Sequence, residues 1–599
     1  MFRGQVTGAV GALALMMSAG LAFGQGEAGK WAVLELDGPV LEAPEGFEWL
    51  FGAEKPLFRQ MIESVREARD NDLGGIVVQV KDLQLNGTQI EELGAALRYV
   101  REGGTKVHVF AENFGPAELT LGAYADQIVM QSGGSVTLPG MHMEEMFLAD
   151  TLGWVGVKAD FVQVGDYKGA SEMFARSAPS PTWDESINTM LDGLYANQRA
   201  TLKAGRKLDD AGLDAAMKSA WMASGQSAIE AKLIDAQIDL PDLPAHLEKV
   251  TGAKVSWAAP IAGEPESSLD MSNPFALLAK LGQQPDNTPT GPTIAVVHIT
   301  GSIVDGESSA GGLLGGGGSV GSRTIRKALS EIEKEELVKG VVVRIDSPGG
   351  SATASEMIWQ GLKRVAKTKP VYVSIGSMAA SGGYYIAVGG DKVFANPSSI
   401  VGSIGVVGGK FVMQGLYDMV KAGVVERSRG PMASMMSTKS VWSPQERELV
   451  RQKMTETYDL FASRVSAGRP GIDLKKTAEG RLFAGTQARE LKMVDEIGGL
   501  HDAVTALASK LGLEDYEVRD YPGPRSLDEM LKGFLPGMAS APVGGASANA
   551  ANVASIGLAG LEAIMGPRAF AQVRSQLSAL IQMREERVML VMPRIVVVK

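Results

Sequence analysis

The sequence predicts an α/β fold made of two tandem copies of a β-β-α type domain, with parallel strands covered by helices. Short apolar runs alternate with segments of helical periodicity, as where Gly75–Val80 is followed by the amphipathic segment Ile90–Arg101. The same order of elements recurs about 265 residues later, so that Gly340–Ile345 matches Gly75–Val80. Between the copies lies 259–292, a predicted linker rich in Pro, Ser, Asn, Gln and Gly, with one short apolar piece.

Each element of the first copy has a counterpart in the second. Near-continuous apolar runs predict strands buried on both faces of a parallel sheet. In the first copy the expected strands are Trp31–Val40, Gly75–Val80 and Lys106–Ala111, and the expected helices are Lys55–Ala68, Ile90–Arg101 and Thr182–Gly205. In the second copy the expected strands are Thr293–Gly301, Gly340–Ile345 and Pro370–Ser374, and the expected helices are Thr324–Glu336, Ala354–Lys367 and Ser443–Gly468. Gly306–Ser322 is predicted to be a mobile glycine-rich loop, and Val588–Lys599 to be strand-like.

Composition excludes several classes of function. A chain of 599 residues is too long for one hydrophobic core. Its net charge of −11 argues against a nucleic-acid partner held through phosphates. Because there is no cysteine, there is no thiol nucleophile, disulfide or thiolate metal site. We predict no cofactor and no metal.

The N-terminus has the pattern of a secretory signal peptide. A basic start, Met1–Arg3, precedes the uncharged apolar stretch 6–23, and Ala22–Gly24 has the small-x-small form of a cleavage site. Hydropathy does not separate a cleaved signal from a retained membrane anchor. We therefore expect an exported protein on the periplasmic or extracytoplasmic side of the membrane. The predicted organisation is a signal or anchor (1–24), a first domain (30–258), a linker (259–292), a second domain (293–535), and a second linker with a C-terminal segment (536–599).

A candidate nucleophile, Ser381, stands between a predicted strand and an apolar helical segment. Two glycines follow it directly, so a substrate backbone can approach the hydroxyl without meeting side chains. The alternative reading is an ordinary helix N-cap, a position in which serine is common.

The differences between the copies favour the catalytic reading. The first copy has Pro116 where the second has Ser381, and it lacks the glycine turn Asp346–Gly350. Conversely, Lys168 of the first copy falls opposite or close to Pro431 of the second. One copy thus has a lysine without the serine, and the other a serine without the lysine. A catalytic pair split between the copies would explain this pattern.

A serine nucleophile activated by a lysine base is consistent with the residues in these motifs. The five histidines, His108, His142, His246, His298 and His501, lie outside these motifs, so nothing indicates a Ser-His-Asp triad. Lysine acts as a base only when neutral, which requires that burial lower its pKa. The backbone N–H groups of Gly350 and Gly382 are candidate oxyanion donors. Ser403 is a candidate to orient the lysine amine, and its alternative role is that of a turn residue.

These residues resemble the signal peptide peptidase A (protease IV) family, in its long tandem form with a ClpP/crotonase-like fold. The resemblance runs from about Ala32 to the C-terminal segment and is most specific at four motifs. These are Asp346–Ser351, Ser377–Tyr385, Gly402–Gly405 and Gly165–Ala170; the last continues with Gly-Ala after its Tyr-Lys, where Ser-Ala is commoner. The resemblance implies that Ser381 is the nucleophile, Lys168 the general base and Ser403 a residue that helps to position the lysine. It also implies a homotetramer and substrates such as cleaved signal peptides.

We therefore expect a serine endopeptidase with a Ser-Lys dyad, acting on peptides at the membrane through an acyl-enzyme. Two alternatives remain open at this point. One is a crotonase-type acyl-CoA enzyme, since that fold can be shared. The other is a catalytically inactive membrane-associated scaffold.

Overall fold

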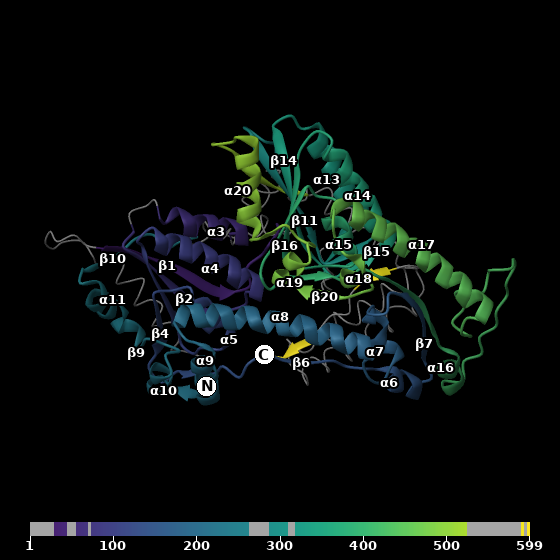
Figure 1. Cartoon of the computed structure of the whole chain (residues 1–599), viewed down its shortest axis with the longest axis horizontal. Coiled ribbons are helices and arrows are strands. Elements are labelled where there is room, and N and C mark those ends of the chain that lie inside the picture. The colour runs from purple at the N-terminus through teal and green to yellow at the C-terminus, as the bar shows by residue number, and fades with distance from the viewer. Residues whose placement is uncertain are drawn as a thin grey trace, which may run out of the picture. The chain divides into compact units, whose positions relative to one another are not determined.

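The computed structural model describes residues 29–44, 56–69, 73–262, 287–309 and 318–523, together with the backbone of 589–591 and 596–598. Two compact units are present (Figure 1). The first comprises residues up to 42, 53–141 and 195–267; the second comprises 43–52, 142–194 and 268 onward. The predicted domains, 30–258 and 293–535, follow the sequence repeat, whereas the compact units place 142–194 with the second repeat. The reason is a pairing between strands of the two repeats, described below.

The first unit is built on a six-stranded sheet in which all neighbouring strands are parallel. In spatial order the strands are β10 (Val255–Trp257), β1 (Gly29–Gly38), β2 (Gly75–Leu83), β3 (Lys106–Ala111), β4 (Gln127–Gln131) and β9 (Ala236–Ile238). Its helices are α3 (Phe58–Glu67), α4 (Gly87–Glu102), α5 (Pro116–Gly122), α9 (Asp210–Ser219), α10 (Gly225–Glu230) and α11 (Leu243–Thr251). A short antiparallel pair joins β5 (Ser135–Val136) and β8 (Ala223–Ser224).

The second unit repeats this order. Its parallel strands run β22 (Glu517–Tyr521), β11 (Thr293–Thr300), β14 (Val338–Ser347), β16 (Val371–Ala380), β17 (Lys392–Ala395) and β21 (Glu496–Ile497). Strand β16 also pairs with β18 (Ile400–Gly402), which pairs with β20 (Leu482–Ala484). The helices are α13 (Ser322–Lys334), α14 (Ala352–Val365), α15 (Gly382–Ala387), α17 (Pro444–Gly468), α18 (Leu474–Thr477), α19 (Gly485–Glu490) and α20 (Leu500–Leu511). The duplication predicted from sequence is therefore present, strand for strand, in the two sheets.

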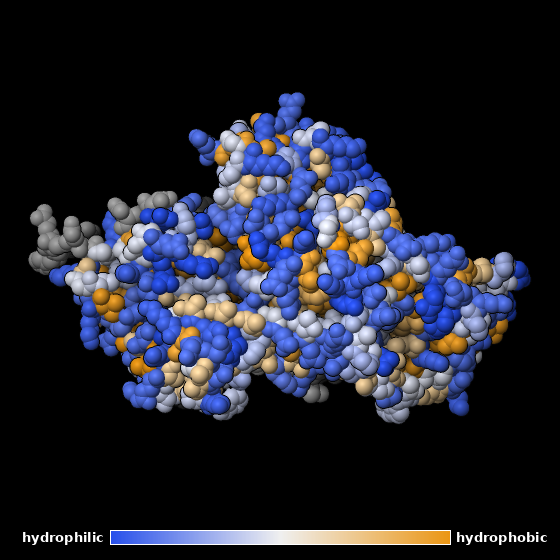
Figure 2. Space-filling model, in the orientation of Figure 1, coloured by the Kyte–Doolittle hydropathy of each residue, from blue (hydrophilic) through white to orange (hydrophobic). Residues whose placement is uncertain are grey.

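Both sheets are buried on both faces, as their apolar strands predict. Along β14, Val341 and Val343 belong to one hydrophobic cluster and Val342 belongs to another. Along β2, Ile76 and Val77 separate in the same way. Because successive side chains of a strand point to opposite faces, helices must cover both sides. Figure 2 shows a molecular face on which hydrophilic residues predominate, in keeping with this burial.

A third sheet crosses the boundary between the repeats and holds the candidate site. Its order is β13 (Ser319–Gly321), β12 (Ser302–Val304), β15 (Gly349–Ser351), β23 (Met589–Val591), β19 (Val406–Val412) and β7 (Lys158–Val164). Strand β7 comes from the first repeat and is antiparallel to β19 along seven residues, from Lys158 opposite Val412 to Val164 opposite Val406. This long pairing is why 142–194 belongs to the second unit.

The second unit has further short elements. They are β6 (His142–Glu144), which pairs with β24 (Val596–Val598), and the helices α6 (Ala149–Trp154), α7 (Glu172–Ala175) and α16 (Gln414–Met419). Of these, α6 and α7 contact β7. Helix α8 (Pro181–Arg206) leads from the second unit back into the first.

Among the described residues, no helix has the length and apolar character that a membrane span requires. The predicted apolar segment 6–23 lies outside the described residues. So does part of each of three other predicted segments: the linker 259–292, the loop 306–322 and the C-terminal segment 536–599.

Candidate active site

Ser381 occupies a strained joint between β16 and α15. Its backbone has φ 54° and ψ −112°, in a region that non-glycine residues rarely adopt. Such conformations cost roughly 1–3 kcal/mol and persist only where surrounding contacts enforce them. Here the Ser381 N–H donates to Gly402 O at 2.8 Å, and its carbonyl accepts from Tyr385 N–H at 2.9 Å. The serine is fully buried, so its hydroxyl is held in one place rather than left to rotate in solvent.

Lys168 follows β7 and extends into the same buried space. Its Nζ lies 2.7 Å from Ser381 Oγ, 2.8 Å from Ser403 Oγ and 2.8 Å from the Ser403 carbonyl oxygen. A neutral amine has two N–H donors and one lone pair. The two donors match the two oxygens of Ser403, and the lone pair then faces the hydroxyl proton of Ser381. The geometry therefore fits a base that accepts the serine proton.

Burial lowers the pKa of Lys168 well below its usual value of 10.5. The side chain is 1% exposed, and no charge of a described carboxylate offsets its loss of solvation. The free-energy cost of removing the Lys168 ammonium from water is therefore not offset by a neighbouring negative charge. This is the condition that a lysine base needs at neutral pH.

The lysine loop is held in position by close backbone packing at three glycines. At Gly480, which has φ +98°, an added Cβ would lie 2.4 Å from Lys168 N. At Gly405 it would lie 3.0 Å from Lys168 Cδ, and at Gly165 2.7 Å from the carbonyl carbon of Glu479. The Tyr167 N–H also donates to Glu479 O at 2.8 Å. The segment before β20 therefore forms one wall of the lysine site.

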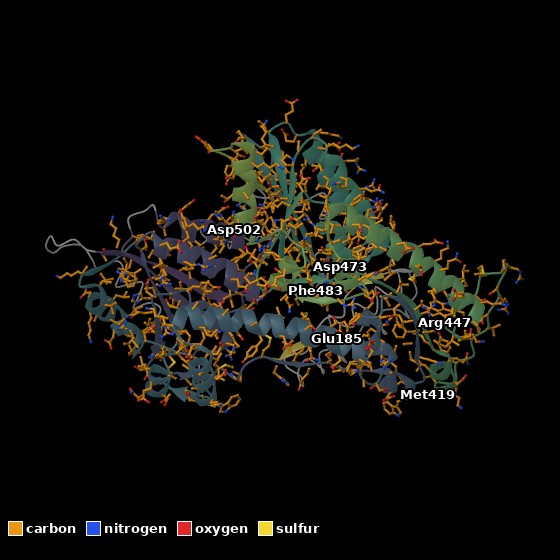
Figure 3. The ribbon with its side chains drawn as sticks, viewed as in Figure 1. Glu185, Met419, Arg447, Asp473, Phe483 and Asp502 are labelled. Atoms are coloured by element: carbon orange, nitrogen blue, oxygen red, sulfur yellow. The ribbon has the colours of Figure 1, made fainter. Side chains whose placement is uncertain are left out.

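Strand β7 is anchored by Asp160, a buried carboxylate. Asp160 Oδ2 accepts from Trp442 N–H at 2.7 Å, and Oδ1 pairs with Arg447 of α17, which is labelled in Figure 3. Arg447 also donates to Phe161 O at 3.0 Å. Because β7 ends only four residues before Lys168, these bonds help to fix where the lysine loop begins.

Ser403 shares the strained backbone of the nucleophile, with φ 55°. Its N–H donates to Arg481 O at 2.7 Å, and it is 2% exposed. The preceding Gly402 has φ 117°, and a Cβ there would lie 2.6 Å from the same Arg481 oxygen. Ser403 is therefore held against the lysine by backbone contacts on both sides.

The two predicted oxyanion donors are adjacent. A Cβ added to Gly382 would lie 3.2 Å from Gly350 N, so the two glycines meet beside Ser381. At Gly350, which has φ 157°, an added Cβ would lie 1.9 Å from Ile303 O. Only glycine fits this position, because the backbone of Ile303 fills the space that a side chain would need.

The structure thus brings together all five residues singled out in the sequence. The serine's described side-chain partner is Lys168, and none of the five histidines bonds to it. His298 instead pairs with Asp520 at 2.8 Å, between the neighbouring strands β11 and β22. Among the described residues there is no cluster of His, Asp or Glu suited to a metal ion.

Sequence reasoning missed the residues that support the site. These include Gly480 and Arg481, whose guanidinium carbon lies 3.7 Å from the Tyr167 ring centroid, and the pair Asp160 and Arg447. They act through backbone packing and long-range pairing, so no short motif marks them. The only hint was the glycine of Glu479–Arg481, placed just before an apolar strand.

Comparison with known proteins agrees with this arrangement. The model of peptidase family S49 matches residues 100–255 and 363–514, which together make up about half of the chain. The chain belongs to peptidase family S49. The resemblance recognised in the sequence is thereby confirmed, as is the α/β fold with two parallel-sheet domains. A Clp protease model also matches residues 319–404, the part of the chain that contains Ser381 and the glycine turn.

Three relatives of this chain carry protease or peptidase names. Protease 4 of Salmonella typhi is 28% identical over 506 residues, covering 82% of this chain and 78% of the relative. Protease 4 of Haemophilus influenzae is 28% identical over 482 residues, which cover 77% of this chain and 74% of the relative. A putative signal peptide peptidase SppA of Enterococcus faecium is 35% identical over 199 residues, which cover 32% of this chain and 57% of the relative. The chain is therefore similar to long protease 4 sequences over most of its length.

Proposed function

We propose that this S49 chain is a serine endopeptidase in which Ser381 is the nucleophile and Lys168 the general base. The observation that carries the proposal is the buried contact of 2.7 Å between Lys168 Nζ and Ser381 Oγ. The lowered pKa of Lys168 supports it, because a neutral amine can take the hydroxyl proton. The backbone strain at Ser381 supports it further, since it holds the hydroxyl against that amine.

The reaction follows from the positions of these groups. Lys168 takes the proton as Ser381 Oγ attacks the substrate carbonyl, and the amides of Gly350 and Gly382 stabilise the oxyanion. The lysine then protonates the leaving amine, which leaves an acyl-serine. Water attacks this ester with Lys168 again as base, and Ser381 is restored. Ser403 keeps the amine aimed at the serine through two bonds of 2.8 Å.

The proposed substrates are extended peptides with small or apolar side chains, such as remnants of cleaved signal peptides. An extended peptide binds most simply by adding a strand to a sheet edge. The name of the Enterococcus faecium relative, a putative signal peptide peptidase, points to the same class. An exported location, membrane attachment through 6–23 and a homotetramer complete the proposal, on the basis of the sequence pattern and the resemblance.

The test is peptide hydrolysis by the full chain with single substitutions. Ser381→Ala and Lys168→Met should each lower kcat by about 10⁴-fold or more, with little change in KM. The control is Pro116→Ala, at the position of the first repeat that corresponds to Ser381, which should leave activity unchanged. Near wild-type hydrolysis by either dyad variant would overturn the proposal.

A second measurement separates the alternatives. A fluorophosphonate should label Ser381 in the wild type and fail to label Ser381→Ala. A crotonase-type enzyme would instead process an acyl-CoA thioester without needing Ser381 or Lys168. An inactive scaffold would show neither labelling nor hydrolysis. The labelling rate should rise about tenfold per pH unit below the pKa of Lys168 and then level off, because only the neutral amine activates the serine.

A further inference from the structure

Ser347, the last residue of β14, is fully buried beside the glycine turn, and none of the catalytic steps uses it. Its Oγ donates to the Gly301 carbonyl oxygen at 2.7 Å and accepts from the Gly349 N–H at 3.1 Å. Gly301 follows β11, the neighbour of β14 in the sheet, and its own N–H donates to Asp346 O at 2.9 Å. One hydroxyl therefore joins the turns at the ends of two neighbouring strands.

The glycine turn needs a bond of this kind, because its own residues do not select one conformation. Gly349 and Gly350 have φ values of 100° and 157°, which glycine tolerates without preferring them. Pro348 before them has no N–H, so the first amide of the turn is that of Gly349. Ser347 Oγ fixes the direction of this amide. A shift there would move the Gly350 N–H, which is one peptide unit further on.

Ser347 also contacts the start of the helix that carries the second oxyanion donor. A Cβ added to Gly383 would lie 2.9 Å from Ser347 O and 3.4 Å from Ser347 Cβ. A Cβ added to Gly382 would lie 3.3 Å from Gly349 Cα. The two amides that we assign to the oxyanion, those of Gly350 and Gly382, are thus each next in sequence to a glycine that Ser347 contacts.

The segment 301–305 runs along the glycine turn and is bonded to it at its start, middle and end. The three contacts are Gly301 O with Ser347 Oγ at 2.7 Å, Ile303 with Gly350 as parallel strand partners, and Asp305 Oδ2 with Ser351 Oγ at 3.2 Å. The middle contact is made by backbone, and Ser351 also caps α14. Ser347 is therefore the side chain whose removal affects the turn most directly.

We propose that Ser347 is a positioning residue for the oxyanion site, whose hydroxyl sets the place of the Gly350 N–H relative to Ser381. It touches neither the substrate nor the reacting atoms, and it acts through the glycine turn. This inference rests on the proposed peptidase function, in which the Gly350 amide stabilises the oxyanion.

The first repeat differs at the corresponding position. By the offset of about 265 residues, Asp82 stands where the second repeat has Ser347, and its Oδ2 accepts from the Gln84 side chain at 2.5 Å. The first repeat also lacks the glycine turn. The bridging serine thus occurs in the copy whose turn it holds.

Loss of the Ser347 hydroxyl should affect the transition state more than substrate binding. The oxyanion forms only when Ser381 attacks, so the exact place of the Gly350 N–H matters little to a bound peptide. Ser347→Ala removes the partner of both the Gly349 N–H and the Gly301 carbonyl. A displacement of the Gly350 N–H by less than about 1 Å should lower kcat by about 10- to 10²-fold and leave KM nearly unchanged.

The decisive measurement compares two inhibitors that share one apolar peptide sequence and end in an aldehyde or in the matching alcohol. Ser381 Oγ adds to the aldehyde carbon, the C=O π bond opens, and the serine proton passes to Lys168, so the former carbonyl oxygen becomes an oxyanion. The alcohol cannot react in this way. In Ser347→Ala the aldehyde should bind more weakly by the factor by which kcat falls, and the alcohol should bind as in the wild type. Equal losses for both inhibitors overturn the proposal.

Two further variants separate positioning from a structural role. Ser347→Cys keeps the size of the side chain but weakens its hydrogen bonds, so it should lower kcat nearly as much as Ser347→Ala. It also carries the inhibitor comparison if the alanine variant does not fold. Wild-type kcat in Ser347→Cys would show that residue 347 only fills space. Ser374→Ala is the matched control, because Ser374 of β16 is equally buried and accepts from Arg344 at 3.0 Å. It should leave the ratio of the two inhibitor affinities unchanged.

The wild type shows which proposal fails. If it hydrolyses peptides and prefers the aldehyde to the alcohol, and Ser347→Ala behaves identically, the positioning role is overturned and the peptidase function stands. If the wild type neither hydrolyses peptides nor prefers the aldehyde, the peptidase function itself fails.

Discussion

The two repeats share one scaffold and differ in local backbone strain. Their sheets have the same strand order, yet the strand-to-helix joints that correspond to each other are built differently. In the first repeat Gly115 precedes α5 with φ −94°, and Pro116 begins the helix. In the second, Ser381 is the residue directly before α15 and holds φ 54°. The two copies thus share the strand order of the fold, while the unfavourable backbone conformation is present only in the copy where it serves the proposed chemistry.

The turns after the second strand show the same contrast. In the first repeat Asn86 caps α4 in the ordinary way, accepting from Gln89 N–H at 3.0 Å. In the second, Gly349 and Gly350 have φ values of 100° and 157° and form an extra strand, β15. The first repeat therefore lacks both the strained serine and the glycine turn, and it contributes to the site through the arm that carries Lys168.

The largest effect that sharpens this comparison is expected at the glycine turn. Gly350→Ala would place a Cβ 1.9 Å from Ile303 O, so the turn must move and the oxyanion loses a donor. We expect kcat to fall by about 10²–10³-fold in the peptide assay. Gly87→Ala is the control, at the start of α4 in the first repeat, where a Cβ meets nothing within 4 Å. Wild-type kcat in Gly350→Ala would contradict the assigned role.

The next effect tests the wall of the lysine site. Gly480→Ala would bring a Cβ within 2.4 Å of Lys168 N and displace the base from Ser381. A displacement of about 1 Å is expected to cost about 10²-fold in kcat with little change in KM. Gly423→Ala, where a Cβ meets nothing within 4 Å, should be neutral. A rise in KM at constant kcat would show that Gly480 acts on substrate binding instead.

The third prediction concerns stability and pH. Because burial lowers the pKa of Lys168, the unfolded chain binds a proton at this site that the folded chain releases. This costs stability at neutral pH, and the cost vanishes as the pH rises to the unfolded value near 10.5. Lys168→Met should therefore raise the free energy of unfolding at pH 7, by an amount that shrinks toward pH 10, as measured by denaturant titration.

The control for that measurement is Lys475→Met, since Lys475 is exposed. Its stability relative to the wild type should show no comparable dependence on pH. If Lys168→Met destabilises the protein equally at pH 7 and pH 10, the buried lysine is charged and the assignment of a neutral base fails.

The smallest expected effect comes from transplanting the nucleophile. Pro116→Ser with Ala117→Gly places the Ser-Gly pair of the second repeat at the corresponding joint of the first. In the Ser381→Ala background we expect no fluorophosphonate labelling, because residue 116 begins an ordinary helix without a strained backbone and no glycine turn faces it. Labelling at residue 116 would show that strain at the joint is dispensable.

The sequence alone determined the duplicated α/β fold, the order of its elements and the identity of the candidate residues. These follow from local periodicity, from the repeat and from the presence of a residue in one copy and not in the other, all of which are visible along the chain. Strand ends are less well predicted: the sequence predicts a strand over Pro370–Ser374, whereas β16 runs from Val371 to Ala380 because its second half pairs with β18.

Only the tertiary structure decided how Lys168 reaches Ser381. That contact depends on β7 leaving its own repeat to pair with β19, and on Gly480 and Gly405 leaving room for the lysine. It also depends on Asp160 meeting Arg447 nearly 300 residues away, a separation at which no local pattern is informative. The placement of 589–591 beside Gly350 is of the same kind, because backbone pairing between distant segments leaves little trace in either sequence.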